Sequence, residues 1–144
     1  MRGAARLYSP ELLELAVRLA AYPWKDDMSH YGDARSPSCG SQISIGLQVD
    51  GNSRISRIGL RSRACAVGQA AAAIFADGAL WKAADLIAPA EAELVLWLAG
   101  EGDMPDWPGV GALVPALDYP GRHGAILLPW RAAIAALSNA RSSR

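Results

Sequence analysis

The fold is decided by residues 37–66, PSCGSQISIGLQVDGNSRISRIGLRSRACA, which contain the two cysteines of the chain. Apolar residues alternate with polar or small ones over residues 42–49, and this period of two is typical of a half-buried strand. Residues 50–53, DGNS, favour a turn, and a second apolar run covers residues 55–60. The alternation shifts by one residue within this second run, which indicates a bulge. The pattern therefore predicts an antiparallel hairpin.

The two cysteines flank this hairpin. Cys39 precedes the first strand and Cys65 follows the second. Because a short turn brings the outer ends of two antiparallel strands together, we expect both sulfur atoms at the same end of the sheet. Small residues adjoin them, Gly40 after Cys39 and Ala64 and Ala66 around Cys65, and leave room for a ligand to approach. The alternative is that both are small buried hydrophobes.

Helices are expected before and after the hairpin in the sequence. Ser9 as N-cap and Pro10 at the first helical position predict a helix that ends before Pro23. Residues 24–35 show no period and are expected to form an exposed connection with one short edge strand. An alanine-rich run predicts a helix that begins at Cys65 or the residue after it. Further helical segments are expected over residues 80–87, 90–98, 112–117 and 125–137.

The predicted position of Cys65 at the start of a helix favours a reactive thiolate. At a helix N-terminus, unpaired N–H groups and the helix dipole stabilise negative charge on the sulfur, which suits it to bind metal or to accept a persulfide. His123 precedes the last predicted helix in the same way. An ordinary loop histidine is the alternative. No other candidate ligand stands at a motif-like spacing from His30 in the sequence, so His30 is expected at the surface.

Aromatic and basic residues receive structural interpretations. The tryptophans of the C-terminal part are scattered singly and are expected to be core anchors: Trp81, Trp97, Trp107 and Trp130. Four arginines near the second strand are expected on a solvated face, because no aromatic residues interleave with them as they would in a nucleic-acid site: Arg54, Arg57, Arg61 and Arg63.

Length and charge narrow the class of protein. The chain has 144 residues and is expected to form one domain over residues 1–144, with a core over about 8–138 and a polar tail over 138–144. Its 14 basic and 14 acidic side chains balance, which excludes binding of nucleic acid or anionic membrane by bulk electrostatics. No segment has the pattern of a signal peptide or a membrane span, so we expect a cytoplasmic protein. Two cysteines in that reducing compartment favour reactive or metal-binding thiols over a disulfide.

The order of these motifs resembles a known family. The motifs are Pro-x-Cys-Gly at residues 37–40, the alternating strand, the Asp-Gly turn, Ala64-Cys65 before a helix of small residues, and Arg122-His123 before the final helix. They resemble the U-type iron-sulfur cluster scaffolds, the NifU N-terminal, IscU and SufU group, over about residues 8–138. The resemblance implies an α+β fold of the SufE/NifU-like type. We expect a small antiparallel sheet of two or three strands with helices packed on one face.

The resemblance also implies a function. It indicates a scaffold or carrier in iron-sulfur cluster assembly, not an enzyme, in which Cys39 and Cys65 bind iron or the cluster and His123 is an auxiliary ligand. The cargo would be an iron-sulfur cluster of the [2Fe–2S] type, or iron, with zinc as an alternative. The implied partners are a cysteine desulfurase and iron-sulfur acceptor proteins, with a possible homodimer and with neither nucleic acid nor membrane.

Two positions depart from the family pattern. The family has an aspartate where this chain has Ser41 and a third cysteine where it has Gly124. Both changes remove negative charge, which weakens a site for cations. Three outcomes are open: a cluster completed by a partner, a small thiol or a second copy; zinc on Cys39, Cys65 and His123; or a metal-free module that regulates the pathway or accepts sulfur.

Overall fold

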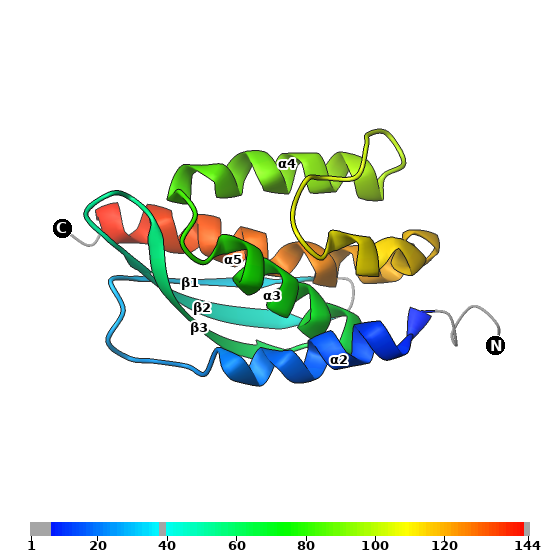
Figure 1. The fold of residues 1–144 in the computed structure, drawn as a ribbon, viewed down its shortest axis with the longest axis horizontal. Coiled ribbons are helices and arrows are strands. Elements are labelled where there is room, and N and C mark those ends of the chain that lie inside the picture. The colour runs from blue at the N-terminus through cyan, green and yellow to red at the C-terminus, as the bar shows by residue number, and fades with distance from the viewer. Residues whose placement is uncertain (1–6, 38–39, 143–144) are drawn as a thin grey trace.

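The computed structural model describes residues 7–37 and 40–142, with side chains described as far as Asn139. One three-stranded antiparallel sheet, in the order β1-β2-β3, is covered by helices on one face (Figure 1). The elements in chain order are α2 (Pro10–Arg18), η1 (Leu19–Ala21), β1 (His30–Arg35), β2 (Gln42–Val49), β3 (Ile55–Arg63), α3 (Ala66–Ala79), η2 (Ala84–Leu86), α4 (Ile87–Leu98), η3 (Val110–Asp118), η4 (Pro120–Arg122) and α5 (His123–Ser142). The expected α+β class is confirmed.

The predicted hairpin is present: β2 has the predicted bounds, and β3 continues past the predicted run to Arg63. β2 pairs with β3 from Gln42 opposite Arg63 to Val49 opposite Ile55, and the register shifts beside Val49, so the expected bulge is confirmed. β1 adds antiparallel to the other side of β2 and is the short edge strand expected before the hairpin. Residues 36–41 therefore join β1 to β2 at the same end of the sheet at which β3 ends.

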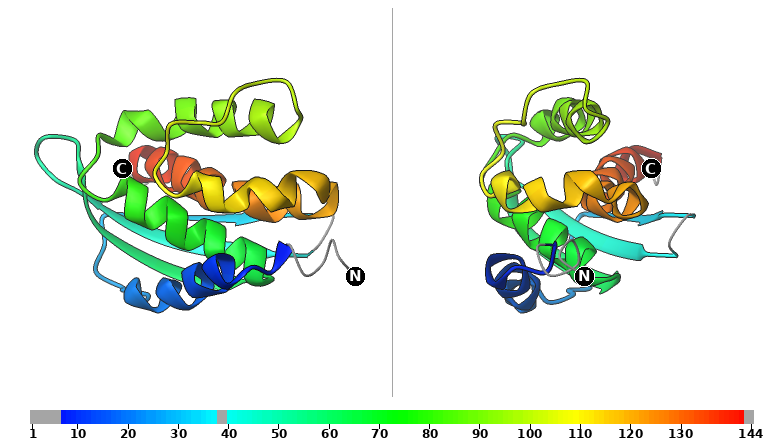
Figure 2. Two further views of the ribbon diagram at one scale, coloured as in Figure 1. Left: turned by 45° about the vertical axis from the view of Figure 1, so that its right-hand side comes forward. Right: turned by 90° about the vertical axis from the view of Figure 1, so that its right-hand side faces the viewer.

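The helices form two layers over the sheet. α5 lies across β1 and β2, and α3 lies beside it between α2 and α5, as Figures 1 and 2 show. α4 packs on α5 on the side away from the sheet. The inner side chains of β2, Ile43, Ile45 and Leu47, are at most 2% exposed beneath these helices. The alternation in the sequence thus buries one face of the hairpin against the helices.

The other face of the sheet carries the arginines as expected. Arg54, Arg57, Arg61 and Arg63 are all exposed. Arg57 pairs with Asp27 at 3.1 Å, and the guanidinium of Arg61 stacks over the ring of Trp24 at 4.1 Å. The expected solvated arginine face is confirmed, although the connection after α2 covers part of it.

Three expectations about the C-terminal half were wrong. Residues 80–83 are not helical, and one helix, α4, replaces the two helices expected on either side of Pro89. This proline lies in the first turn of α4, where its missing N–H has no partner to lose. α5 begins at His123 and continues to Ser142, so it is longer at both ends than the helix expected over residues 125–137, and Pro129 lies inside it.

The expectation for Trp81 was also wrong. Trp97 and Trp130 are buried, and Trp107 is partly buried against the core, but Trp81 is 59% exposed.

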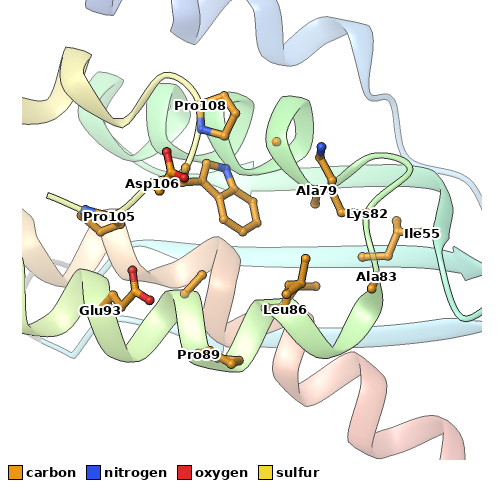
Figure 3. A pocket seen from close by; sticks show the side chains of 14 residues that line it. Ile55, Ala79, Lys82, Ala83, Leu86, Pro89, Glu93, Pro105, Asp106 and Pro108 are labelled. Carbon is orange, nitrogen blue, oxygen red and sulfur yellow. The ribbon is translucent and has the colours of Figure 1, made fainter.

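Between α3, α4 and the loop that follows α4, the structure has an open cavity of about 450 Å³ (Figure 3). No helix in the described part of the chain is long and apolar enough to cross a bilayer.

Asp77 near the end of α3 connects α3 to the end of α2. Its carboxylate accepts hydrogen bonds from the guanidinium of Arg18, at 2.6 Å, and from the hydroxyl of Tyr22. Burial alone would raise the pKa of Asp77, but the hydrogen bonds from Arg18 and Tyr22 outweigh it, and the pKa is lowered. Burial and the hydrogen bond to Asp77 raise the pKa of Tyr22 to about 12.

These two shifts predict a loss of stability at both ends of the pH range. Asp77 stabilises the fold fully above its unfolded pKa of about 4, and this contribution is lost as the pH falls through the lower pKa of the folded state. The contribution of Tyr22 is complete below about pH 10 and is lost as the pH rises through its folded pKa. We expect Asp77→Asn to flatten the acid side and Tyr22→Phe the alkaline side of a plot of unfolding free energy against pH.

Urea unfolding at a series of pH values measures both effects. Tyr119→Phe is a matched control, because the Tyr119 hydroxyl has no hydrogen bond among the described residues. If Tyr22→Phe and Tyr119→Phe give the same alkaline slope, the hydrogen bond to Asp77 does not control stability there.

Candidate functional site

Cys65 is the N-cap of α3, as the sequence predicted. Its backbone is extended (φ −67°, ψ 172°), its carbonyl accepts the first helical hydrogen bond from the Gln69 amide at 2.9 Å, and its side chain makes no capping bond. The Gln69 side chain donates to the carbonyl of Ala64 at 3.0 Å and holds the turn in front of the cysteine. Cys65 is a free, half-buried thiol beside unpaired N–H groups of the helix.

His123 is the first residue of α5. Its Nε2 lies 3.0 Å from the carbonyl oxygen of Ala116. Because a carbonyl can only accept a hydrogen bond, Nε2 carries the proton, and in the neutral ring the lone pair is on Nδ1. A hydrogen bond from one ring nitrogen to a backbone carbonyl is the usual support for a histidine that binds metal through the other nitrogen.

Packing between α3 and α5 brings these two residues into the same region. Gly68 lies in the first turn of α3, and a Cβ built on it would be 3.3 Å from the Cβ of Ala125 in the first turn of α5. Gly68 is three residues after Cys65, and Ala125 is two residues after His123. The N-termini of the two helices therefore meet, each with a residue that can bind a metal or sulfur. Cys65 and His123 stand at these two N-termini, and their joint role as ligands stays a prediction.

Cys39 lies outside the described residues, so its position stays a prediction. Its neighbours form a tight connection: the Ser36 amide donates to the Ser41 carbonyl at 2.8 Å, and the Gly40 amide donates to the Ser36 carbonyl at 2.9 Å. Gly40 has φ +73°, a conformation that strains other residues. Since Gln42 pairs with Arg63, this connection and the turn that carries Cys65 lie at the same end of the sheet.

The region around the site contains positive charge. The first turns of α3 and α5 have no acidic residue. Arg63 is exposed two residues before Cys65, and Arg122 precedes His123 with its guanidinium 3.4 Å from the Tyr8 hydroxyl. Among the described residues, no three His, Cys, Asp or Glu side chains are arranged to hold a metal ion.

Two residues that the sequence interpretation missed belong to this region. Ser62 points to the helix side of β3 opposite Ile43, and among the described residues its Oγ is the one buried side-chain oxygen or nitrogen without a hydrogen-bond partner. Gln69 fixes the Ala64 carbonyl. Ser62 follows Ile58 and Leu60 at a period of two, so its inward direction could have been deduced. The Gln69 contact had no signal in the sequence.

The close approach at Gly68 provides a stability prediction. In Gly68→Ala, the new Cβ would be 2.8 Å from the Cβ of Ala64, which is too close for two carbon atoms, so the turn that carries Cys65 must shift. We expect a loss of about 1–3 kcal/mol in the free energy of unfolding, measured by urea denaturation. Gly111→Ala is the control, because a Cβ there meets nothing within 4 Å. Equal stability of the two variants would contradict this packing.

Comparison with known proteins identifies the fold. No family model and no curated protein matches the sequence. Among solved structures, the N-terminal domain of a nitrogen-fixing NifU-like protein from Brucella abortus superimposes with a TM-score of 0.87 at 21% identity, over 99% of both chains. A candidate iron-sulfur cluster assembly scaffold protein for the SUF system, from Fervidobacterium islandicum AW-1, has a TM-score of 0.80 at 20% identity, over 91% of this chain and 96% of its own.

A third structure, of a hypothetical protein, has a TM-score of 0.69 at 19% identity and covers 88% of this chain and 96% of its own. The coverage shows that the likeness extends over nearly the whole chain in each case. The chain therefore has the U-type scaffold fold, as the motifs in the sequence indicated.

Proposed function

We propose that this chain is a scaffold or carrier in iron-sulfur cluster assembly. Cys39 and Cys65 bind iron or a cluster, and His123 is an auxiliary ligand. The protein is not an enzyme: it receives the cargo, holds it and delivers it to acceptor proteins in the cytoplasm, with a cysteine desulfurase as the source of sulfur. The chain acts as one domain.

The observation that carries this proposal is the meeting of the N-termini of α3 and α5 at Gly68 and Ala125, because Cys65 is the N-cap of α3 and His123 is the first residue of α5. The fold is that of structures described as NifU-like and as an iron-sulfur cluster assembly scaffold. Thiolate and imidazole are ligands that iron-sulfur clusters accept, and zinc accepts them as well. The Nδ1 lone pair of His123 and the Cys65 thiol are two such donors.

The ligand set of one chain is incomplete. Cys39, Cys65 and His123 provide three donors at most, whereas a [2Fe–2S] cluster has four protein ligands. Ser41 is buried and uncharged, and Gly124 has no donor atom. We propose that the remaining ligand comes from a partner, a small thiol or a second copy, since two cysteines from each of two chains make four.

Anaerobic reconstitution with iron and sulfide tests the proposal. The expected result is visible absorption from sulfur-to-iron charge transfer and iron in elemental analysis of the parent chain. In Cys39→Ser/Cys65→Ser, both signals should fall to background. His123→Ala should retain a cluster that is lost faster to a chelator, and His30→Ala is its matched control, since these are the two histidines of the chain.

Each alternative gives a different result. Zinc without iron in freshly purified protein would assign the site to zinc. If the parent chain contains neither iron nor zinc, and the double cysteine variant gives the same metal content and absorption as the parent, the scaffold proposal is overturned in favour of a metal-free module.

Sulfur acceptance is a second candidate, favoured by the absence of acidic residues in the first turns of α3 and α5. The Cys65 thiolate would attack the outer sulfur of a persulfide on the desulfurase. An S–S bond to Cys65 would form, the S–S bond on the desulfurase would break, and the desulfurase cysteine would leave as a thiolate. Mass spectrometry should then detect one added sulfur on Cys65 and none on Cys65→Ser.

A further inference from the structure

The cavity beside α4 lies away from the cysteine end of the fold. It is bounded by Gly78 and Ala79 at the C-terminal end of α3, by α4, and by residues 105–108 (Figure 3). Cys65 is at the opposite end of α3, which has 14 residues, so about 20 Å of helix separates the two sites. The cavity volume of about 450 Å³ is large enough for side chains of a bound segment.

The floor of this cavity is apolar and rigid. The Trp107 indole packs against Gly78, where no side chain could be accommodated, and its Nε1 donates to the Ile74 carbonyl at 2.9 Å. Ile87 and Ala79, both buried, also line the cavity. A partner would therefore meet an apolar surface that is already formed, and its binding would cost little ordering of the floor.

Apolar surface continues outside the cavity. Leu86 at its edge is 52% exposed, and Trp81, next to the lining residue Lys82, is 59% exposed. Trp81 has φ +69°, a strained conformation for a bulky residue. Its amide donates to the Ile55 carbonyl at 2.6 Å, and its carbonyl accepts from Arg54 at 3.2 Å, so the backbone is held on both sides. This surface extends beyond what a small ligand would cover.

The rim of the cavity is acidic. Figure 3 shows the carboxylates of Glu93 and Asp106 at one end and Lys82 at the other. In the described part of the chain, neither carboxylate has a hydrogen bond or ion pair. Residues 83–121 contain no Lys or Arg and seven acidic residues: Asp85, Glu91, Glu93, Glu101, Asp103, Asp106 and Asp118. Of these seven, Glu93 and Asp106 line the cavity, and Glu91 is paired with Arg131.

We propose that this groove binds a segment of a partner protein in which apolar side chains stand next to a lysine or arginine. The apolar side chains would cover Trp107 and Leu86, and the cation would lie between Glu93 and Asp106. Apolar floors with charged rims are the usual form of segment-binding grooves. Because the groove is remote from Cys65, a partner bound there leaves the cysteine end accessible.

A second copy of this chain fits the groove less well. The exposed apolar residues of α2, Leu13 and Val17, stand beside Arg18, whose guanidinium is already paired with Asp77. The exposed arginines of β3 lie on the polar face of the sheet, and no large exposed hydrophobic residue of the described chain lies on that strand. Trp81 next to Lys82 does combine an exposed apolar side chain with an unpaired cation in the described chain, but both border the groove itself.

The test uses a short synthetic amphipathic peptide of leucine, alanine and arginine, and a control peptide with glutamate in place of each arginine. Titration of the full chain, followed by amide NMR shifts, should show saturable changes over residues 78–108 with the basic peptide only. Glu93→Gln/Asp106→Asn should weaken binding about fivefold, and salt should weaken the parent complex. Glu101→Gln/Asp103→Asn removes two exposed carboxylates that do not line the groove and should leave the affinity unchanged.

Leu86→Ser tests the apolar contribution and, being exposed, should leave the fold intact. It should weaken binding about tenfold. If both carboxylate double variants weaken binding equally, the peptide is attracted by the overall negative charge and not by the groove, and the proposal is overturned. Binding of the glutamate peptide, or shifts outside the groove, would overturn it as well. Concentration-dependent dimerisation that Leu86→Ser abolishes would assign the groove to a second copy instead.

Discussion

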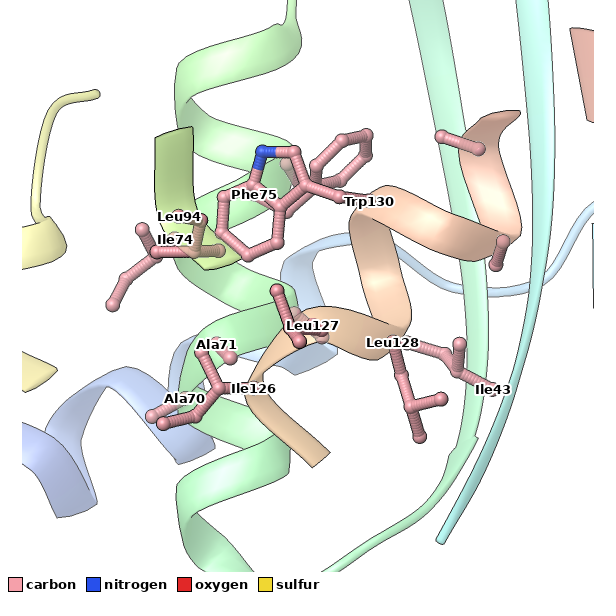
Figure 4. Packing of buried hydrophobic residues seen from close by; sticks show 14 of the residues in the cluster. Ile43, Ala70, Ala71, Ile74, Phe75, Leu94, Ile126, Leu127, Leu128 and Trp130 are labelled. Atoms are coloured by element: carbon pink, nitrogen blue, oxygen red, sulfur yellow. The ribbon is translucent and has the colours of Figure 1, made fainter. Parts of the chain in front are cut away.

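Replacement of Trp130 by alanine is expected to lower the free energy of unfolding by about 3–5 kcal/mol. Trp130 is 1% exposed and is the largest fully buried side chain among the described residues. Its ring meets Phe75 edge-on at 5.4 Å and Trp107 edge-on at 5.3 Å, and Figure 4 shows it against Phe75 between α3 and α5. The variant loses the transfer energy of the ring, leaves a cavity and removes two aromatic contacts.

Urea or thermal unfolding measures this loss. Trp81→Ala is the matched control, because it removes the same ring from an exposed position and should change the free energy of unfolding by less than about 1 kcal/mol. If both variants lost the same amount, the three-ring cluster would not be the centre of the core. Since Trp107 also forms the floor of the groove, Trp130→Ala should weaken binding of the basic peptide as well.

Introduction of a single methyl group at Gly32 is expected to be nearly as damaging. Gly32 is in β1, directly beneath α5, and a Cβ there would clash with the backbone of Ala132 and Ala136, coming within 2.8 Å of the Ala136 Cα. Backbone atoms cannot move aside as a flexible side chain can, so the helix must lift from the sheet. We expect Gly32→Ala to cost about 3 kcal/mol, with unfolding in denaturant as the measurement.

The control for Gly32→Ala is Gly51→Ala in the hairpin turn, where a Cβ meets nothing within 4 Å. Because α5 begins with His123, displacement of the helix should also change the environment of that imidazole, which its NMR signals would detect. If Gly32→Ala is as stable as the control and the His123 signals do not move, the close contact between β1 and α5 is wrong.

Local patterns in the sequence predicted the centre of the fold. Alternation and the Asp-Gly turn predicted β2, β3 and the bulge, because both depend on neighbouring residues alone. The change from β pattern to alanines predicted Cys65 at the start of α3. The prolines were harder. A proline is compatible with a first helical turn and disfavoured inside, so Pro89 and Pro129 could not be placed without knowing which packing stabilises each helix.

In the candidate site, too, the features set by the local sequence were predicted and those set by packing were not. The sequence predicted that Cys65 and His123 begin helices, which is a local property. The contact between Gly68 and Ala125, where the N-termini of α3 and α5 meet, depends on the packing of the two helices and had no signal along the chain. The hydrogen bond from His123 to the Ala116 carbonyl depends on the course of η3. The exposure of Trp81 was missed because scattered tryptophans are usually buried.

Pro129 inside α5 has a consequence for the turn that carries His123. Proline has no amide hydrogen, so the carbonyl of Ala125 receives no bond from the next turn of the helix. The first turn of α5 thus lacks one of the hydrogen bonds that would join it to the next turn. Amide protons around residues 126–128 should exchange with solvent before those around residues 132–136, and the imidazole could be released by local opening while the body of the helix stays folded.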